Sequence, residues 1–505
     1  MMIEALILVT VASAVAVMFA DDEIAGRLAF GLSLLPLVGS LLMYLGFDGS
    51  GNALLGGDIA YETQASWITL GNLEVGYHVG VDAIGLSLVL LTTVLMSLAL
   101  LSAWTPIDKR QSQFYGLMLF MEASLLGVFT ALNFLVWFVA WEFVLVPMYF
   151  LIAIWGGPRR KYAAFFVYTN VASLVMFIGF IALVFALPVQ TLDMPTIAQA
   201  LRAGKLTALA GIEPGTLKAI AFIAIFAGFA VKVPMVPFHT WLPDAHVEAP
   251  TPVSVILAGV LLKMGTYAML RFNFTMLAGQ AKEFAVPIAI FAVISVIYGA
   301  MLAMGQRDLK RIVAYSSVSS MGYVLLGLVA YTLYGLGGAT FQMVAHGLIS
   351  GLMFMSVGVI YNVAHTRMVG DLSGIADRMP LTATVFTAAA FGYMGLPLMA
   401  GFAGELYIFL GGMQSTVLPY APVFTALAMF GIVIVAGYLL FAMQRVLFGP
   451  FEADTDHEIV PAPVTDRIAI VALVLIVILL GTAPDLIYGM IQDAVKPILA
   501  IGGGL

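Results

Sequence analysis

The sequence contains no cysteine, and charged residues are scarce in it. Without cysteine the chain can form no disulfide and can offer no thiolate to zinc or to an iron–sulfur cluster. Only 10% of the 505 residues are charged, whereas soluble globular domains carry about 25%. A soluble fold could not cover a chain that is 62% hydrophobic with a polar surface. The composition therefore predicts an integral membrane protein.

Signatures of nucleotide and nucleic-acid binding are missing as well. The sequence has no G-x-G-x-x-G between a strand and a helix, and no G-x-x-x-x-G-K-S/T. A net charge of -7 and the lack of a long basic run argue against nucleic acid. The six histidines are not arranged as paired haem ligands within a span. We therefore expect no cofactor, metal or nucleic acid on this chain.

Apolar runs long enough to cross a bilayer recur along the whole sequence. A crossing helix needs roughly 20 apolar residues, and the runs predict an all-α membrane fold of about fourteen transmembrane helices. The first run lacks a basic segment before it and carries Glu4, so it is predicted to be a retained span and not a signal peptide. The predicted spans are 3–20, 27–46, 82–104, 113–131, 134–155, 163–187, 216–240, 252–271, 285–304, 312–332, 339–362, 381–410, 422–445 and 467–490.

Two connections between spans are longer than the others. Residues 47–81 are glycine-rich and acidic and contain no lysine or arginine. Residues 188–215 include a polar segment, Thr196 to Lys205, which is expected to lie along the membrane interface.

Basic residues are distributed unequally between the two sets of loops, and this predicts the orientation. Six fall on one side and thirteen on the other, which the positive-inside rule assigns to the cytoplasm. Both termini then face outward, which requires an even number of spans. The six are Arg202, Lys205, Lys218, Arg271, Lys282 and Lys496; the thirteen are Arg27, Lys109, Arg110, Arg159, Arg160, Lys161, Arg307, Lys310, Arg311, Arg367, Arg378, Arg445 and Arg467.

Two predicted spans carry helix breakers near their middle. One reads Lys232-Val-Pro-Met-Val-Pro237 and the other Gly395-Leu-Pro-Leu-Met-Ala-Gly401. A proline inside a helix costs ~3 kcal/mol or more. Simple proline kinks are one interpretation; paired broken helices of two inverted repeats are the other. We expect the repeats to form the core at 113–272 and 273–446, with N-terminal spans and an outer loop at 1–112 and a last loop and span at 447–505.

Five ionisable residues fall within predicted spans: Glu122, Glu142, Lys232, Lys263 and Glu405. An isolated charge at a helix centre costs roughly 2.5–3.5 kcal/mol. The charges could form static ion pairs between helices, or they could change protonation state as a relay. Buried ion pairs stabilise little compared with apolar packing, so we favour the relay.

Glu122 and Glu142 are predicted to lie at one depth. Each is about ten residues from a tight turn at Leu132 and Asn133, which places both ~15 Å into the membrane. Two carboxylates at the same depth disfavour joint ionisation. Lys232, in a broken helix, is the candidate cation between them.

Histidines complete the set of candidate relay residues. His346 lies inside a span, where either a hydrogen-bonded core role or a proton-relay role is open. His239 and His246 flank the Trp241-Leu-Pro-Asp244 segment, whereas His78, His365 and His457 are in loops.

Several motifs resemble the M-type (chain 4) antiporter-like subunits of respiratory complex I, NADH:quinone oxidoreductase. They are Trp141-Glu-Phe-Val-Leu-Val-Pro-Met-Tyr-Phe150, Trp155-Gly-Gly-Pro-Arg-Arg-Lys-Tyr-Ala-Ala164, Lys232-Val-Pro-Met-Val-Pro-Phe-His239, Trp241-Leu-Pro-Asp-Ala-His-Val-Glu-Ala-Pro250 and Leu262-Lys-Met-Gly-Thr-Tyr267. The resemblance is most specific between residues 115 and 405. Glu405, in Gly401-Phe-Ala-Gly-Glu405, resembles the M type, since sister subunits usually carry lysine there.

The resemblance implies roles for individual residues. Glu142 and Lys232 resemble the functional ion pair, Lys263 the central connecting lysine, and Glu405 the terminal exchange group. His239 and His346 match relay positions of the family. Ser320 departs from the pattern, because some relatives carry histidine there.

The resemblance also implies a setting. We expect a bacterial inner membrane, with L-type and N-type subunits as neighbours and FMN, iron–sulfur clusters and quinone in other subunits. Proton translocation would be coupled to quinone reduction elsewhere in the complex. The alternatives are a subunit of a cation/proton antiporter or membrane-bound hydrogenase, and a non-conducting scaffold.

Overall fold

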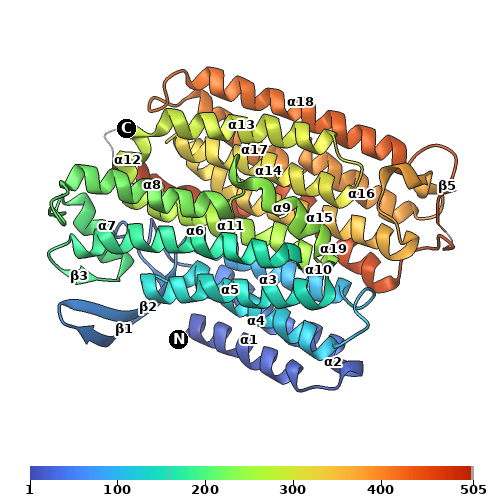
Figure 1. The fold of residues 1–505 in the computed structure, drawn as a ribbon, viewed down its shortest axis with the longest axis horizontal. Helices are drawn as coiled ribbons and strands as arrows, with labels where there is room; N and C mark the ends of the chain where they lie inside the picture. The colour runs from blue at the N-terminus through green and yellow to red at the C-terminus, as the bar shows by residue number, and fades with distance from the viewer. Residues whose placement is uncertain (158–159, 456, 502–505) are drawn as a thin grey trace.

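Long helices run side by side through most of the protein (Figure 1). The structure, a computed structural model, describes residues 1–157, 160–455 and 457–501. Within these residues twelve helices are long and apolar enough to cross a membrane, judged by length and composition. The predicted all-α membrane fold is therefore confirmed. Eleven of the twelve are α2 (Asp22–Leu45), α3 (Ala83–Ser102), α4 (Gln111–Thr130), α5 (Phe134–Trp155), α6 (Arg160–Phe185), α8 (Pro214–Lys232), α13 (Ala285–Met304), α14 (Leu309–Val329), α15 (Leu333–Ala364), α18 (Ala421–Val446) and α19 (Val464–Thr482).

The twelfth span, Thr251–Met276, is not a regular α-helix. Two π-helical stretches, η2 (Leu257–Leu261) and η3 (Met269–Met276), alternate in it with α10 (Thr251–Ile256) and α11 (Leu262–Ala268). π-helical turns occur mostly as short insertions within α-helices and are frequent at functional sites. This span is therefore a candidate for a functional role. Its apolar window is entirely buried within the protein.

The predicted number of about fourteen spans is not confirmed by length and composition. The two remaining predicted spans correspond to α1 (Met2–Met18), which is 17 residues long, and to a pair of 14-residue helices, α16 (Pro380–Tyr393) and α17 (Ala400–Met413). The shorter helices outside these spans are α7 (Met194–Arg202), η1 (Phe238–Thr240), α9 (Trp241–Glu248), α12 (Ala278–Glu283), η4 (Val369–Asp371), η5 (Ile375–Asp377) and α20 (Asp485–Ala500).

Both predicted helix breaks lie where the proline and glycine residues indicated. α8 ends at Lys232, and the chain resumes helical turns only in η1 and α9. α16 ends at Tyr393, and α17 begins at Ala400. Gly395, between them, has φ +62°, a left-handed conformation that glycine adopts without a steric penalty. Each break leaves backbone N–H and C=O groups without helical hydrogen bonds. Within a membrane such groups need partners from protein or water.

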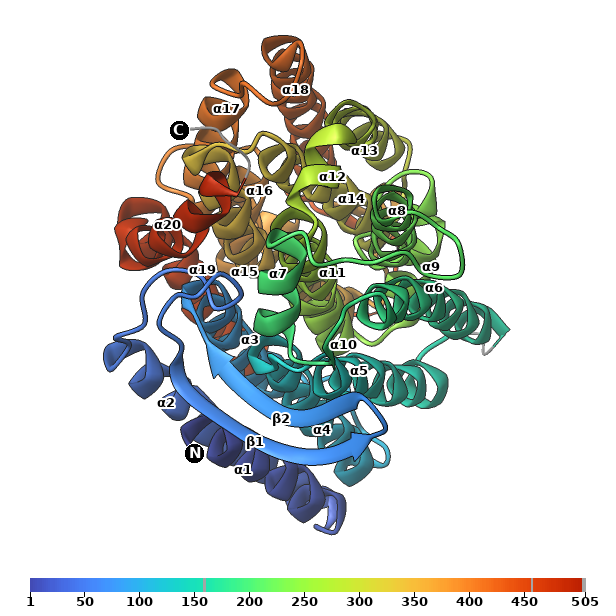
Figure 2. The same cartoon turned by 90° about the vertical axis from the view of Figure 1, so that its left-hand side faces the viewer.

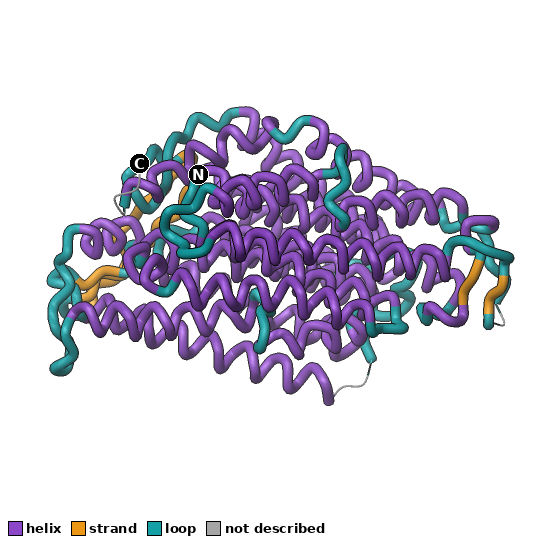
Figure 3. The backbone as a smooth tube through the Cα atoms, turned by 90° about the horizontal axis from the view of Figure 1, so that it is seen from above, coloured by secondary structure: helices purple, strands orange, loops and turns teal. Residues whose placement is uncertain are grey.

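The 47–81 connection contains a β-hairpin that the sequence composition did not predict. β1 (Ala60–Leu70) and β2 (Leu73–Val81) pair antiparallel, and β3 (Gln190–Thr191) extends β2 in parallel. The hairpin lies across the ends of α3, α4 and α5 (Figure 2). A second, short pair, β4 (Leu372–Ser373) and β5 (Glu452–Ala453), lies at the opposite end of the helices (Figure 3).

A fully paired histidine fastens the hairpin to the segment before α7. His78 Nδ1 lies 2.5 Å from Asp193 Oδ1, and its Nε2 lies 2.9 Å from Glu62 Oε1. Two carboxylate contacts require a donor at each ring nitrogen, which only the imidazolium provides. α7 itself buries Met194, Ile197, Ala198 and Leu201 along one side, as expected for an interfacial helix.

The two ends of the chain lie at the same end of the helical body. The N-terminal amine donates to Thr63 Oγ1 in β1, and Asn52 Nδ2 donates to the carbonyl of Ala494 in α20. This arrangement is consistent with an even number of crossings.

Two basic residues counted as loop cations are buried, which corrects their predicted environment. Arg271 forms a two-pronged ion pair with Asp82, the N-cap residue of α3, and is only 2% exposed. Lys310, in the first turn of α14, is 3% exposed and donates to the carbonyl of Ala249 at 2.8 Å. Arg159 lies outside the described residues.

Candidate functional site

Lys232 is the last residue of α8 and lies at the point where the first break begins. Its side chain is 3% exposed, and Nζ lies 5.3 Å from the centre of the Trp141 ring on α5. Such a cation–π contact partly replaces the lost hydration of an ammonium group. Nζ has no hydrogen-bond partner among the described residues.

Glu142 follows Trp141 on α5 and interacts electrostatically with Lys232. Its Oε1 is buried without a hydrogen-bond partner in the described part of the chain. Trp141 donates from Nε1 to Ser173 Oγ at 3.0 Å, which fixes the indole beside both charges. The predicted pair is thus brought together, but no ion pair within 4 Å joins its members among the described residues. The pair is open, with the indole of Trp141 against the lysine.

Glu122, the second predicted carboxylate, is separate from this pair. It is fully buried on α4, and neither carboxyl oxygen has a partner among the described residues. The electrostatic interactions of Lys232 involve Glu142 and not Glu122. The role of Lys232 as the cation between both glutamates stays a prediction.

Lys263 lies in α11, between the two π-helical stretches. Its Nζ donates to the carbonyl of Ala258 at 2.6 Å and lies 2.6 Å from His346 Nδ1 on α15. A hydrogen bond between an amine and an imidazole nitrogen needs a proton on one of the two atoms only. Lys263 and His346 therefore share a proton position, and among the described residues no carboxylate forms an ion pair with Lys263.

Glycine packing makes this lysine–histidine contact possible. A Cβ on Gly347 would lie 2.7 Å from the carbonyl oxygen of Gly259, and one on Gly259 would lie 3.3 Å from that of Gly347. Small residues let two membrane helices approach this closely. The backbones of the π-helical span and α15 thus meet about one turn from Lys263 and directly beside His346.

Two further histidines, His239 and His246, lie in the helical segment that follows α8. His239 lies in η1, within the first break, with its ring against those of Tyr298 and Tyr315. His246 stacks on Phe354 at 4.4 Å between ring centres, and both of its ring nitrogens are buried without a hydrogen-bond partner among the described residues.

Glu405 lies over the second break. It is 4% exposed on α17, and its Oε2 would be 2.3 Å from a Cβ placed on Gly395, so the carboxyl group rests against the broken backbone. Its Oε2 has no hydrogen-bond partner among the described residues. Ser320, the departure from the family pattern, is buried on α14.

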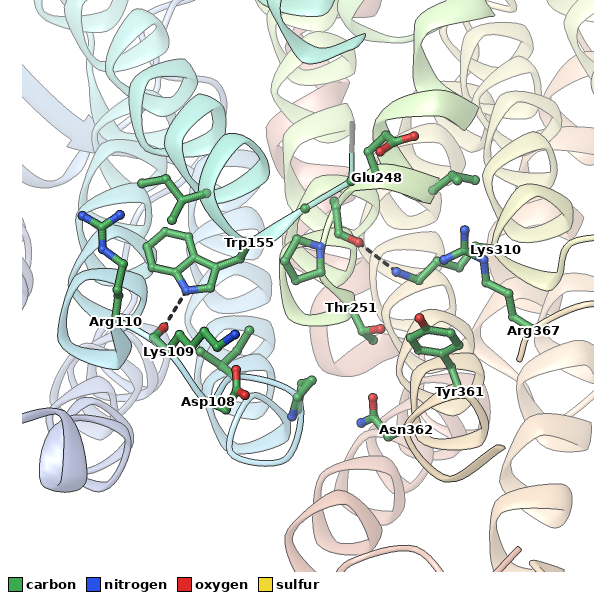
Figure 4. A pocket seen from close by; sticks show the side chains of 18 residues that line it. Asp108, Lys109, Arg110, Trp155, Glu248, Thr251, Lys310, Tyr361, Asn362 and Arg367 are labelled. Carbon is green, nitrogen blue, oxygen red and sulfur yellow. Dashed lines mark hydrogen bonds between the residues drawn. The ribbon is translucent and has the colours of Figure 1, made fainter. Parts of the chain in front are cut away.

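Sequence reasoning missed a polar cavity between the loop after α3, the end of α5 and the start of α14, whose lining side chains Figure 4 shows. It has a volume of about 740 Å³, and Lys310, Glu248, Lys109 and Arg367 line it. Proximity to a loop suggested that Lys310 is exposed. The one available signal for burial of Lys310 was its position two residues after Asp308, the N-cap residue of α14. A side chain at that position can turn into the bundle.

Comparisons with known proteins agree with this arrangement. A family described as NADH:quinone oxidoreductase/Mrp antiporter, TM, matches residues 131–434. The chain is 37% identical over 512 residues to F(420)H(2) dehydrogenase subunit M of Methanosarcina mazei, which covers 99% of this chain and 98% of that protein. It is 40% identical over 416 residues to a NAD(P)H-quinone oxidoreductase chain 4 of Synechococcus, which covers 81% of this chain and 76% of the relative. Its fold matches a chain of respiratory complex I from Thermus thermophilus with bound NADH at a TM-score of 0.87, with 24% identity over all of both chains.

Proposed function

This chain belongs to the NADH:quinone oxidoreductase/Mrp antiporter family of membrane subunits, and from that premise we propose that it is an M-type, chain 4 subunit that translocates protons. The observation that carries the proposal is the contact between Lys263 and His346 in the fully buried core. A static ion pair needs opposite charges, whereas an amine and an imidazole can only share a proton. This favours a titrating relay over charges that merely hold helices together.

The relay begins at the first break. When Glu142 approaches Lys232, it favours the charged ammonium; when it withdraws, the buried lysine releases its proton. The open geometry of this pair, with Trp141 against the ammonium, supports such movement. Glu122, alone on α4, is a proton acceptor at the entrance side of the same pair.

Lys263 and His346 then pass the charge along the centre of the bundle, and Glu405 exchanges it at the second break. His239, inside the first break, links the two lysines. In this scheme the broken helices, α8 with α9 and α16 with α17, belong to two inverted repeats at 113–272 and 273–446. Each broken helix supplies the backbone gap that a proton path needs.

The setting follows from the relatives. We propose a bacterial inner membrane, with the cavity end of the bundle in the cytoplasm and both termini outside. L-type and N-type subunits would be the neighbours, and FMN, iron–sulfur clusters and quinone would lie in other subunits. The names of the two relatives give F(420)H(2) and NAD(P)H as alternative electron donors of the complex.

A cation/proton antiporter would use the same residues without redox partners. Membrane vesicles that contain the complex distinguish the two functions: quinone reduction should acidify the vesicle side opposite the cytoplasm, and Lys232→Ala should abolish that acidification while assembly on a native gel is retained. Proton–cation exchange by the isolated subunit would support the antiporter. Unchanged pumping in the Lys232→Ala complex would support a scaffold.

A further inference from the structure

The polar cavity lies where several membrane-spanning helices begin or end. Its walls come from the loop after α3, the last turn of α5, the first turn of α14 and the last turn of α15 (Figure 4). The headgroups of a bilayer lie at the level where spanning helices end, just outside the hydrocarbon core. A cavity at this level is therefore within reach of lipid headgroups as well as of ions in water.

Cationic side chains predominate among the described residues that line the cavity. Trp155 donates from Nε1 to the carbonyl of Lys109 at 2.7 Å, which holds the basic loop after α3 at the cavity. Arg367 is paired with Asp308, at 2.7 Å between Nε and Oδ2. The lining cations still outnumber the carboxylates when Asp308 is included. The cations are Lys109, Arg110, Lys310 and Arg367, and the lining carboxylates are Asp108 and Glu248.

Lys310 is the buried cation of this cavity. It is 3% exposed, and its Nζ makes one hydrogen bond among the described residues, to the carbonyl of Ala249 at 2.8 Å. An ammonium group has three N–H donors, so two are left for other acceptors. Asp308 does not serve, because its Oδ1 accepts from the amide of Lys310 and its Oδ2 binds Arg367. A buried cation without a carboxylate partner is costly, and an anion in the cavity would supply both charge and acceptors.

An exposed apolar stripe on α5 runs to the mouth of the cavity. Its members recur every three or four residues and so lie on one side of the helix. They are Val139, Phe143, Val146, Phe150 and Ile154. Ile154 also lines the cavity, so the stripe and the cavity are continuous. From Val139 to Ile154 the stripe is about 22 Å long, which exceeds the ~15 Å depth of one leaflet, half of the hydrocarbon core. An acyl chain along the stripe would bring its headgroup to the cations.

We propose that the cavity binds the phosphate group of an anionic phospholipid whose acyl chain lies along the α5 stripe. Lys310 donates to the phosphate oxygens from inside, and the exposed Lys109 and Arg110 neutralise the charge at the mouth. Phosphatidylglycerol fits this excess of positive charge better than phosphatidylcholine, which carries a cation of its own beside the phosphate. Inorganic phosphate shares the headgroup chemistry but has no apolar part to cover α5. The site goes beyond proton translocation and does not require the relay.

The test uses the assembled complex in nanodiscs of phosphatidylcholine that contain a small fraction of phosphatidylglycerol with a photoreactive acyl chain. After illumination, mass spectrometry measures the lipid attached to the α5 peptide. We expect attachment along the stripe, and at least about fivefold less when the same reactive chain is carried by phosphatidylcholine. Equal labelling by both lipids would overturn the proposal. So would the absence of labelling on α5, which is the result expected if another subunit covers the stripe.

A double variant removes the exposed cations and keeps Lys310 in place. Each basic residue near the membrane surface changes the binding of anionic lipid by about fivefold, so Lys109→Gln with Arg110→Gln should lower labelling by about twentyfold. The matched control is Arg445→Gln, which removes an exposed cation from the last turn of α18, outside the cavity lining, and should leave labelling unchanged. Unchanged labelling in the double variant, or a comparable loss in the control, would overturn the site.

Lys310→Gln tests the buried cation directly and should also reduce labelling in a complex whose assembly is verified on a native gel. If this variant fails to assemble, the double variant still decides.

Inorganic phosphate distinguishes the two sources of a phosphate group. Replacement of chloride by phosphate at constant ionic strength should leave labelling of α5 nearly unchanged, because the acyl chain adds contacts that free phosphate lacks. Complete loss of labelling under this exchange would assign the cavity to free phosphate and overturn the phospholipid.

Discussion

The two broken helices present ionisable groups in opposite ways. At the first break a lysine lies beside an aromatic ring, and on the neighbouring helix one carboxyl oxygen of Glu142, Oε1, has no hydrogen-bond partner among the described residues. At the second break a carboxylate, Glu405, rests against the backbone at Gly395, and no ion pair joins it to a cation among the described residues. A charge pair can load a proton when its members move apart. A lone carboxylate can only accept and release one, which suits an exchange site.

Removal of the countercharge at the first break should have the largest effect. In Glu142→Ala, Lys232 stays buried with only the Trp141 ring beside it, so the neutral amine is favoured and the loading site empties. We expect proton transfer and coupled quinone reduction to fall by about a hundredfold, as measured in vesicles with assembly verified on a native gel.

Glu142→Asp is the matched variant, because it keeps the charge on a shorter side chain. It should be clearly milder than Glu142→Ala. Near-normal pumping in a correctly assembled Glu142→Ala complex would show that the two breaks do not differ in this way.

Substitutions at the second break should have a smaller effect. Glu405→Gln keeps the shape of the side chain and removes its titration, so pumping should decrease by about tenfold. Glu405→Lys restores a group that can exchange protons when buried, and we expect partial rescue of proton transfer relative to Gln. Equal damage from both variants would mean that only the negative charge matters, and the relay would then end near His346.

A third site, His78 outside the membrane spans, provides a contrast because its charges are fully paired. Burial alone would lower the pKa of His78, but the hydrogen bonds and charges of Asp193 and Glu62 outweigh it and raise the pKa above its usual value. The stabilisation of the hairpin is therefore complete below the unfolded pKa of about 6.5 and is lost as pH rises through the higher folded pKa.

Hydrogen exchange of the β1 and β2 amides, corrected for the intrinsic effect of pH, measures this stabilisation. Protection should decrease on the alkaline side in the wild type and should be independent of pH in His78→Gln. Pumping should change least of all in this variant. If His78→Gln reduced pumping as much as Glu405→Gln does, the comparison would fail. Paired charges such as that of His78 could then not be regarded as structural and unpaired ones as proton-conducting.

Features encoded by neighbouring residues were predictable from the sequence. Long apolar runs identified the spans, and Pro234, Pro237 and Gly395 identified the breaks, because backbone chemistry acts locally. The hairpin was missed because the glycine-rich, acidic composition of 47–81 obscured strand β1, which ends at Leu70 just before the turn at Gly71. Length alone could not settle the number of spans, since α1 and α17 are short.

Features that depend on distant contacts could not be predicted. Lys263 and His346 are 83 positions apart, and the packing of the π-helical span on α15, which is close at Gly259 and Gly347, brings them together. Burial of Arg271 and Lys310 depends on Asp82 and Ala249, which are far away in the sequence. The π-helical turns around Lys263 have no sequence signal that we recognise, although the lysine itself was identified as a candidate.

The number of protons moved per quinone reduced in the Lys263→Arg complex tests the central claim most directly. Arginine stays charged above pH 12 and can donate to His346 only as a permanent cation. A relay requires release of the proton at this position, so we predict that proton transfer is largely lost while the complex assembles. A complex that assembles and pumps at the wild-type ratio with arginine at this position would contradict the relay, because a charge that never dissociates would then be sufficient.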